Sequence, residues 1–277
     1  MTLPKPQNQP RARCLTVPEI RALKHASRKL SMVTCYDASF ARLVSESPID
    51  LLLVGDSSAM VMEGHDSTLH ATVESICGFT RAVASGTAGK KFIVSDMPFL
   101  SNRLGIERGT EAAGALLRSG AHAVKIEGIR GNEDLIKHLV DSGIPVMGHL
   151  GLTPQFVNAF GGMKVQAKTR EDQDRLLHEA FLFEACGAFA LVLECVPMGI
   201  ASQITTRLKI PTIGIGAGPS TDGQVLVLQD LLGFNPDFQP KFLRKYLEGH
   251  RLILEALEKY HQEVTEMRFP SEEESYP

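Results

Sequence analysis

Ionisable side chains stand at the carboxyl ends of several short apolar runs, where a buried strand would finish. Asp56 follows one run, Asp96 ends another, and Glu194 closes the stretch "ALVLE". Burying a charge costs free energy unless that charge has a partner or a chemical task. In chain order the whole set is Asp37, Asp56, Asp96, Lys125 with Glu127, His149 and Glu194. Such a set could bind a cation and move protons.

Two of these residues are the candidates for a metal site. Asp56 and Asp96 are short carboxylates from separate runs, and such a pair suits a hard octahedral cation such as Mg²⁺. Lys125 and Glu127 are two residues apart, so in a strand they share a face, and a plain salt bridge is one interpretation. In the functional interpretation Lys125 receives an anionic substrate group and Glu127 supports the metal, directly or through water. His149 is either a core histidine or a hydrogen-bond donor at the same site.

The combination of a divalent cation, a cationic side chain and a spare carboxylate suits the handling of an α-keto acid. The metal would stabilise the enolate that forms when a neighbouring C–H group loses its proton. The base must be a carboxylate outside the metal's ligand set, and Glu194 is the candidate. An ion pair with Lys125 and direct metal ligation are the alternative roles for Glu194.

The elements that would position these residues recur along the chain. Three helical stretches each end at a glycine, Gly120, Gly143 or Gly187, and a short apolar run follows each of them. Helices are also expected over 38–45, 72–85 and 199–208. Seven runs rich in Val, Ile and Leu favour parallel strands that are buried on both faces. They lie at 31–37, 50–58, 91–98, 121–128, 144–151, 188–197 and 211–218, with a weaker eighth at 224–230.

Eight such units in roughly 250 residues predict an α/β fold, a TIM (β/α)₈ barrel with an extra N-terminal helix and a C-terminal helical extension. A doubly wound open sheet is the alternative, but the first run lacks the glycine-rich turn of dinucleotide-binding sheets. In a barrel the carboxyl ends of the strands meet at one mouth, so the polar residues there would form one site. The alternative is that each of these polar residues caps a helix. We expect one catalytic domain over 17–265, between a flexible tail, 1–16, and an acidic tail, 266–277.

The composition limits the kinds of partner and compartment to expect for this protein. The formal net charge of -3 and the lack of a long basic cluster give no reason to expect a nucleic acid. No apolar stretch reaches the roughly 18 residues of a membrane span, and the polar start lacks the core of a secretory signal. The cysteines, at 14, 35, 77, 186 and 195, form no Cys-x-x-Cys pair. This pattern favours reduced thiols in a cytoplasm-like compartment, so we expect a cytoplasmic protein.

Several stretches together resemble the 3-methyl-2-oxobutanoate hydroxymethyltransferase (ketopantoate hydroxymethyltransferase) family. In order over about 31–245 they are "VGDSSAMVMEGHDSTL", "DMPF", "VKIEG", "GHLGLTPQ", "GGMKVQ", "LVLECVP", "IGIGAGPSTDGQVLV" and "PKF". The resemblance implies a barrel of the phosphoenolpyruvate/pyruvate type. It also implies transfer of a one-carbon unit from 5,10-methylenetetrahydrofolate to 3-methyl-2-oxobutanoate, which gives ketopantoate for pantothenate and coenzyme A.

The resemblance also assigns roles to residues. Asp56 and Asp96 would be ligands of one Mg²⁺ per subunit, with Glu127 at or just outside the ligand set, and Glu194 would be the proton acceptor. Family members form large homo-oligomers, commonly decamers, so a homo-oligomer is expected here. The expected substrate-binding residues are Asp56, Ser57, Asp96, Lys125 and His149.

Five positions depart from the family pattern. "SSAM" replaces Ser-Leu-Gly-Met at two of these positions, His70 replaces a proline, Met163 a tyrosine and Ala167 a glycine, and none of these removes a proposed catalytic group. The alternative enzyme is another metal-dependent keto-acid lyase or aldolase on the same barrel. The Lys-Lys-Cys-Gly-His loop of isocitrate-lyase-like enzymes does not occur in the sequence. Further alternatives are a Schiff base at Lys125 and a binding or scaffold barrel that has lost catalysis.

Overall fold

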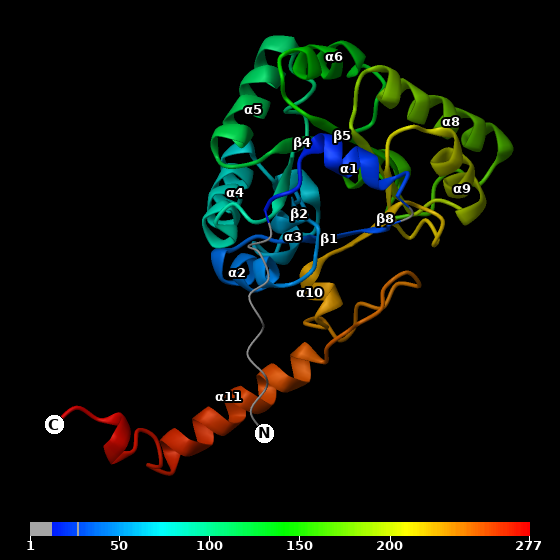
Figure 1. The fold of residues 1–277 in the computed structure, drawn as a ribbon. Helices are drawn as coiled ribbons and strands as arrows, with labels where there is room; N and C mark the ends of the chain where they lie inside the picture. The colour runs from blue at the N-terminus through cyan, green and yellow to red at the C-terminus, as the bar shows by residue number, and fades with distance from the viewer. Residues whose placement is uncertain (1–12, 27) are drawn as a thin grey trace. The chain divides into compact units, whose positions relative to one another are not determined.

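The structure, a computed structural model, describes residues 13–26 and 28–277. Eight parallel strands form a closed barrel in chain order, and pairing of the last strand with the first closes it (Figure 1). The predicted (β/α)₈ barrel is therefore confirmed, and the open sheet is excluded. The strands are β1 Leu30–Thr34, β2 Leu51–Val54, β3 Phe92–Asp96, β4 Ala123–Glu127, β5 Val146–Gly151, β6 Ala190–Glu194, β7 Thr212–Ile215 and β8 Gly223–Leu226.

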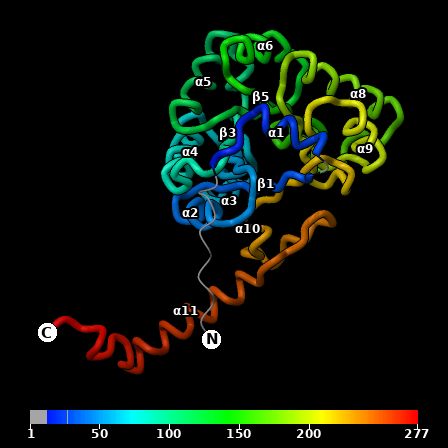
Figure 2. Tube along the Cα trace, viewed as in Figure 1, coloured from blue at the N-terminus to red at the C-terminus, as the bar shows by residue number. Residues whose placement is uncertain are grey.

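Helices surround the ring of strands, as the ribbon and the tube both show (Figures 1 and 2). Gly120, Gly143 and Gly187 follow α5, α6 and α8 with φ of 109°, 84° and 91°, the left-handed conformation predicted for these helix ends. The helices of this part are α1 Val17–Leu23, α2 Ala38–Glu46, α3 Ser58–Val61, α4 Val73–Thr87, α5 Ile106–Arg118, α6 Glu133–Asp141, α7 Val157–Phe160, α8 Arg170–Ala185 and α9 Met198–Arg207, with the 3₁₀ helices η1 Thr68–His70 and η2 Pro154–Phe156.

The chain divides into two compact units, 1–226 and 227–277. The second unit holds α10 (Leu228–Leu231), α11 (Gly249–Thr265) and the 3₁₀ helix η3 (Glu272–Glu274), so the expected C-terminal helical extension is present. The expected catalytic domain, 17–265, begins and ends where α1 begins and α11 ends, but it spans both units and stays a prediction. Of the expected tail, residues 1–12 lie outside the described residues.

The barrel interior is filled by the side chains that point inward from alternate strand positions. Phe92 and Val94 of β3 lie in one buried cluster with Ala190 and Val192 of β6. Ile20 of α1 is fully buried in the same cluster, so the expected N-terminal helix covers this core. Within residues 13–26 and 28–277, no helix is long and apolar enough to cross a membrane.

Candidate active site

The inward positions change from apolar to ionisable at the carboxyl ends of four neighbouring strands. On β3 the inward residues Phe92 and Val94 are followed, two positions further on, by Asp96. The strand register then sets Asp96 beside Lys125 and, one layer further along, Glu127 beside His149. The complete inward set is Asp96 on β3, Lys125 and Glu127 on β4, His149 on β5 and Glu194 on β6. The predicted convergence of these residues is confirmed.

Lys125 lies at the centre of this cluster. Its Nζ is 3.0 Å from Asp96 Oδ1, 3.6 Å from Glu127 Oε1 and 3.1 Å from His149 Nδ1. Both carboxylates are almost completely buried, and the contact with Asp96 is an ion pair without hydrogen-bond alignment, because Asp96 Oδ1 has no hydrogen-bond partner. The salt-bridge interpretation of Lys125 and Glu127 is therefore correct as geometry, but the closer carboxylate is Asp96.

Asp56, directly after β2, is held by a residue that the sequence did not single out. The side chain of Gln155 in η2 donates to Asp56 Oδ2 at 2.8 Å and to the Met97 carbonyl at 3.0 Å. The Gln155 backbone N–H donates to Glu127 Oε2 at 3.1 Å. The Asp56 N–H in turn donates to Asp96 Oδ2 at 2.9 Å. Gln155 therefore connects two of the carboxylates, and its position in "GHLGLTPQ", after a strand end, was its only sequence signal.

His149 joins the buried part of the cluster to Glu194. Its Nδ1 lies 3.2 Å from Glu127 Oε1, and its Nε2 lies 3.3 Å from Glu194 Oε2 without hydrogen-bond alignment. Burial and the Lys125 charge oppose protonation, but the two carboxylates outweigh them and raise the pKa of His149 to about 9. Among the ion pairs of the described residues, the partner of Glu194 is therefore His149 and not Lys125. The Glu194 side chain is 18% exposed, against 3% for His149.

Three further residues lie at the ends of β1 and β2. The predicted substrate-binding residue Ser57 is half-buried beside the cluster, and its Oγ is 2.8 Å from the hydroxyl of buried Tyr36. Asp37 belongs to the strand-end set only in sequence. Its Oδ1 accepts hydrogen bonds from the backbone N–H groups of Ser39 and Phe40, so Asp37 caps the N-terminus of α2. For this residue the alternative of a helix cap is correct.

The buried carboxylates differ in how readily they ionise. Burial first, and then the Asp96 and Glu127 charges, raise the pKa of Asp56 well above its usual value. Burial also raises the pKa of Asp96, although Lys125 opposes this. Burial has the same direction at Glu127, but there His149 and Lys125 outweigh it and lower the pKa. Asp56 is thus the carboxylate whose charge the protein compensates least.

The donor chemistry of this cluster fits a hard divalent cation. Asp56, Asp96 and Glu127 supply carboxylate oxygens, the ligand type that a hard divalent cation prefers. Asp96 Oδ1 is buried without a hydrogen bond, which leaves that oxygen suited to a cation. As they are arranged here, no three His, Cys, Asp or Glu side chains in the described part of the chain form a ready-made metal site. The ligand set therefore stays a prediction.

The fold defines a class, the closed (β/α)₈ barrels with ionisable side chains at the carboxyl ends of the strands. One solved structure that matches is phosphonopyruvate hydrolase in complex with oxalate and Mg²⁺, with a TM-score of 0.62 and 11% identity over 93% of this chain and 92% of that one. Another is 2,3-dimethylmalate lyase, described as a member of the PEP mutase/isocitrate lyase superfamily, with a TM-score of 0.59 and 14% identity over 94% and 92%. At these identities the likeness shows the fold.

The sequence comparisons narrow the class to a family. The family described as ketopantoate hydroxymethyltransferase matches residues 14–272. Relatives named 3-methyl-2-oxobutanoate hydroxymethyltransferase occur in Bdellovibrio bacteriovorus, with 53% identity over 94% of this chain and 99% of the relative, and in Legionella pneumophila, with 48% over 95% and 100%. A relative of the same name in Francisella tularensis is 53% identical over 91% and 95%. The chain belongs to the ketopantoate hydroxymethyltransferase family, so the expected transferase class is confirmed.

Proposed function

We propose that this chain transfers a hydroxymethyl group from 5,10-methylenetetrahydrofolate to 3-methyl-2-oxobutanoate, forming ketopantoate (2-dehydropantoate) for pantothenate and coenzyme A biosynthesis. Family membership supports the reaction. The observation that carries the site is the buried group of Asp56, Asp96, Lys125, Glu127 and His149 beside Glu194 at the strand ends. The donor, the keto acid and one water give ketopantoate and tetrahydrofolate, so the overall reaction balances.

Lys125 is the residue that receives the carboxylate of the keto acid. Burial alone would lower its pKa, but the charges of Asp96, Glu127 and Asp56 outweigh burial and raise it, so the amine stays an ammonium at neutral pH. A Schiff-base lysine must be neutral to attack a carbonyl. This environment therefore favours an anion-binding lysine over the Schiff-base alternative.

Asp56 and Asp96 are the proposed ligands of one Mg²⁺ per subunit, with Glu127 binding directly or through water. The bound ion would supply Lewis-acid polarisation of the keto group and stabilise the developing enolate charge. The protein positions its ligands beforehand. Gln155 holds Asp56 through its amide, and the Asp56 N–H holds Asp96, so two carboxylates from neighbouring strands are fixed next to each other.

Glu194 is the proposed base for the C3 proton of the keto acid. It ends β6 at the rim of the cluster. Its side chain is more exposed than those of Asp96 and Glu127. His149, protonated at neutral pH, orients Glu194 through Nε2 and is itself oriented by Glu127 through Nδ1. Ser57, with Tyr36 behind it, completes the substrate side at the end of β2.

The deciding experiment is an activity assay with 3-methyl-2-oxobutanoate, methylenetetrahydrofolate and Mg²⁺, with and without EDTA. We expect ketopantoate only when the metal is available. Activity that survives EDTA, together with inactivation by borohydride in the presence of substrate, would replace this mechanism with a Schiff base at Lys125. A different product from the keto acid would favour the alternative of another metal-dependent lyase or aldolase, which the family match does not support.

We further propose a cytoplasmic homo-oligomer, a decamer as is common in this family, without nucleic-acid or membrane partners. The large apolar side chains that α11 exposes support assembly, since Leu252, Leu257 and Tyr260 are 42%, 58% and 57% exposed. All five cysteines are free thiols, which supports a reducing compartment. Native mass spectrometry would measure the subunit number, and cell fractionation would test the location.

A further inference from the structure

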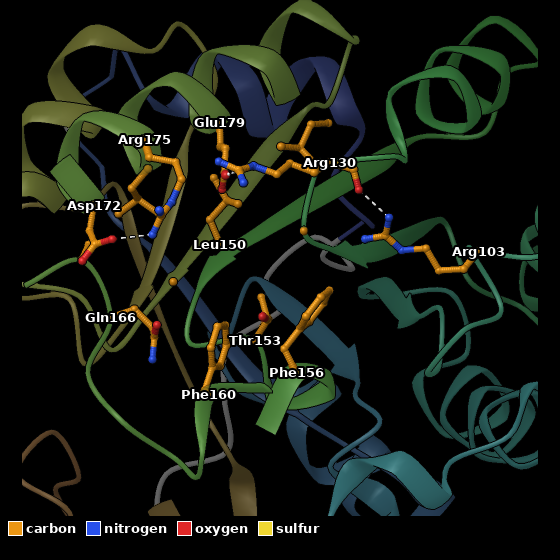
Figure 3. A pocket seen from close by; sticks show the side chains of 15 residues that line it. Arg103, Arg130, Leu150, Thr153, Phe156, Phe160, Gln166, Asp172, Arg175 and Glu179 are labelled. Carbon is orange, nitrogen blue, oxygen red and sulfur yellow. Dashed lines mark hydrogen bonds and ion pairs between the residues drawn. The ribbon is translucent and has the colours of Figure 1, made fainter. Parts of the chain in front are cut away.

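A cavity of about 400 Å³ lies beside the proposed catalytic cluster (Figure 3). This volume is in the range of pockets that enclose a small organic ligand. Its walls come from β5, from the segments after β3, β4 and β5, and from α8, and none of the seven predicted substrate, metal or base residues is among those that line it. The cavity is therefore separate from the keto-acid site but close enough to extend it.

Three backbone connections join this cavity to the catalytic cluster. Gly128, in its wall, directly follows the proposed metal-supporting residue Glu127. Phe156, also in the wall, directly follows Gln155, whose amide holds the carboxylates. On the third side, the Gln166 N–H donates to the carbonyl of Cys195, the residue after Glu194, at 2.9 Å. A ligand in this cavity would therefore lie next to the base and the metal-supporting carboxylate.

The cavity offers an aromatic surface. Phe156 and Phe160, four residues apart, stack with their ring centroids 6.1 Å apart and an angle of 29° between the rings. Both rings are only half-buried, and Figure 3 shows the two side chains next to each other at the cavity. Aromatic pairs of this kind bind a further flat ring by offset stacking. The ligand that fits this wall carries an aromatic ring system.

The cavity also holds a guanidinium that forms no ion pair among the described residues, although the charge of Glu133 acts on it from further away. Arg130 Nε is 2.7 Å from Glu179 Oε1, and Arg175 is paired with Asp172. Within the described part of the chain, Arg103 has no carboxylate at ion-pair distance. Its guanidinium donates to the Arg130 carbonyl and lies 6.0 Å from the centroid of the Phe156 ring. A half-buried guanidinium with free donors suits a carboxylate of a ligand.

Resting on the proposed function, we infer that this cavity binds the folate cosubstrate, with an aromatic ring of the folate on Phe156 and Phe160 and a glutamate carboxylate paired with Arg103. A reduced folate carries a fused heterocycle, an aminobenzoyl ring and a glutamate with two carboxylates. It therefore matches both the aromatic wall and the guanidinium of Arg103, which forms no ion pair among the described residues. The neighbouring Glu127 and Glu194 segments place the donor's methylene carbon beside the keto acid.

The test compares Arg103→Gln with Arg108→Gln, an exposed arginine on α5 that has no ion pair within residues 13–26 and 28–277. Loss of a charge-assisted hydrogen bond should raise the KM for methylenetetrahydrofolate, and the Kd for tetrahydrofolate measured by calorimetry, about tenfold in Arg103→Gln. The KM for 3-methyl-2-oxobutanoate and the Mg²⁺-dependent exchange of its C3 proton should stay as in wild type. The Arg108→Gln variant should match wild type in every measurement.

A donor without the glutamate, methylenetetrahydropteroate, identifies the group that Arg103 binds. Wild type and Arg103→Gln should use this donor equally well, whereas Phe160→Leu should raise the KM for both donors roughly threefold. An unchanged tetrahydrofolate Kd in Arg103→Gln, or an equal loss with the glutamate-free donor, would overturn the assignment. If wild type binds tetrahydrofolate in this way but forms no ketopantoate, the proposed function fails and the folate site stands.

Discussion

Replacing Lys125 by methionine tests whether this residue compensates the buried carboxylates. Methionine has a similar length and fills most of the same volume, so packing changes little. The change removes the only lysine that lies within ion-pair distance of Asp96 or Glu127 among the described residues. Asp96 would then be buried without its nearest positive charge, and Glu127 would keep only His149 beside it, so we expect the metal-free protein to lose stability.

The size of the loss follows from the two distances. At 3.0 and 3.6 Å, and with an effective dielectric constant of roughly 20, each attraction is on the order of 5 kcal/mol before the cost of removing water. Dehydration of the ions offsets most of this, and breaking a buried pair by removing one partner typically costs about 3–5 kcal/mol. For a chain of 277 residues this corresponds to a melting temperature lower by roughly 5–9 °C.

The loss should depend on pH with a definite sign. The pKa of Glu127 is lowered, so its stabilising contribution is present above the unfolded value of 4.5 and is lost as the pH falls through the lower folded pKa. Asp56 and Asp96 have raised pKa values, so their ionised forms cost stability as the pH rises above about 4. Without Lys125 the ionised carboxylates are less well compensated, so the folded state loses more stability where they are charged. The stability lost relative to wild type should therefore be larger at pH 8 than at pH 5.

Thermal unfolding in EDTA between pH 5 and pH 8 provides the measurement, and Lys91→Met is the matched control. Lys91 is also buried, but its Nζ donates to the carbonyl oxygens of Ser47 and Ile49 at 2.6 and 2.5 Å. The stability lost in Lys91→Met should not increase between pH 5 and pH 8. A Lys125→Met protein that melts like wild type at pH 8, or one with the same deficit at pH 5 and pH 8, would refute the reasoning.

Three further substitutions test the base, the metal site and the packing around the barrel. Glu194→Gln should bind the keto acid and Mg²⁺ but fail to exchange the C3 proton with deuterated water, as followed by NMR; exchange at the wild-type rate would assign the base elsewhere. Asp96→Asn should weaken Mg²⁺ binding at least about tenfold in calorimetry, and an unchanged affinity would contradict its role as a ligand. Gly148→Ala should lower the free energy of unfolding in urea by about 1–3 kcal/mol, because the added Cβ would lie 2.6 Å from Phe183 Cδ1; a smaller loss would mean that α8 moves aside.

The sequence was sufficient for the barrel because its signals are local and repeated. Apolar runs, helix-ending glycines and polar strand ends each recur several times along the chain. The weak run 224–230 could therefore be predicted as the eighth strand from the seven clearer ones. The structure ends that strand at Leu226, four residues earlier than the run. Convergence of Asp96, Lys125 and Glu194 follows from strand direction alone, since parallel strands place all their carboxyl ends on one side.

The contacts that the sequence did not predict depend on turns and on side-chain directions. These features leave no repeating pattern in the sequence from which they could be predicted. The role of Gln155 depends on the turn of η2 that brings its amide to Asp56, and the proximity of His149 and Glu194 depends on how far each side chain reaches across the mouth. Ala167 is an intermediate case. The family resemblance places a glycine there, and the structure gives Ala167 a φ of 54°, in the left-handed region that glycine adopts most easily.

The closure of the sheet has a consequence for the order of folding. β8 pairs with β1, and Lys24 at the end of α1 reaches across to Asp222, 2.7 Å away, just before β8. Neither of these two strands supplies a charged group to the catalytic cluster, so all the carboxylates are synthesised before the strand that shuts the cylinder. We expect the carboxylates to lose their remaining water when that last strand docks, so that the final step carries the electrostatic cost of burying them. We therefore expect divalent cations to accelerate the late phase of refolding and to leave the early phase unchanged.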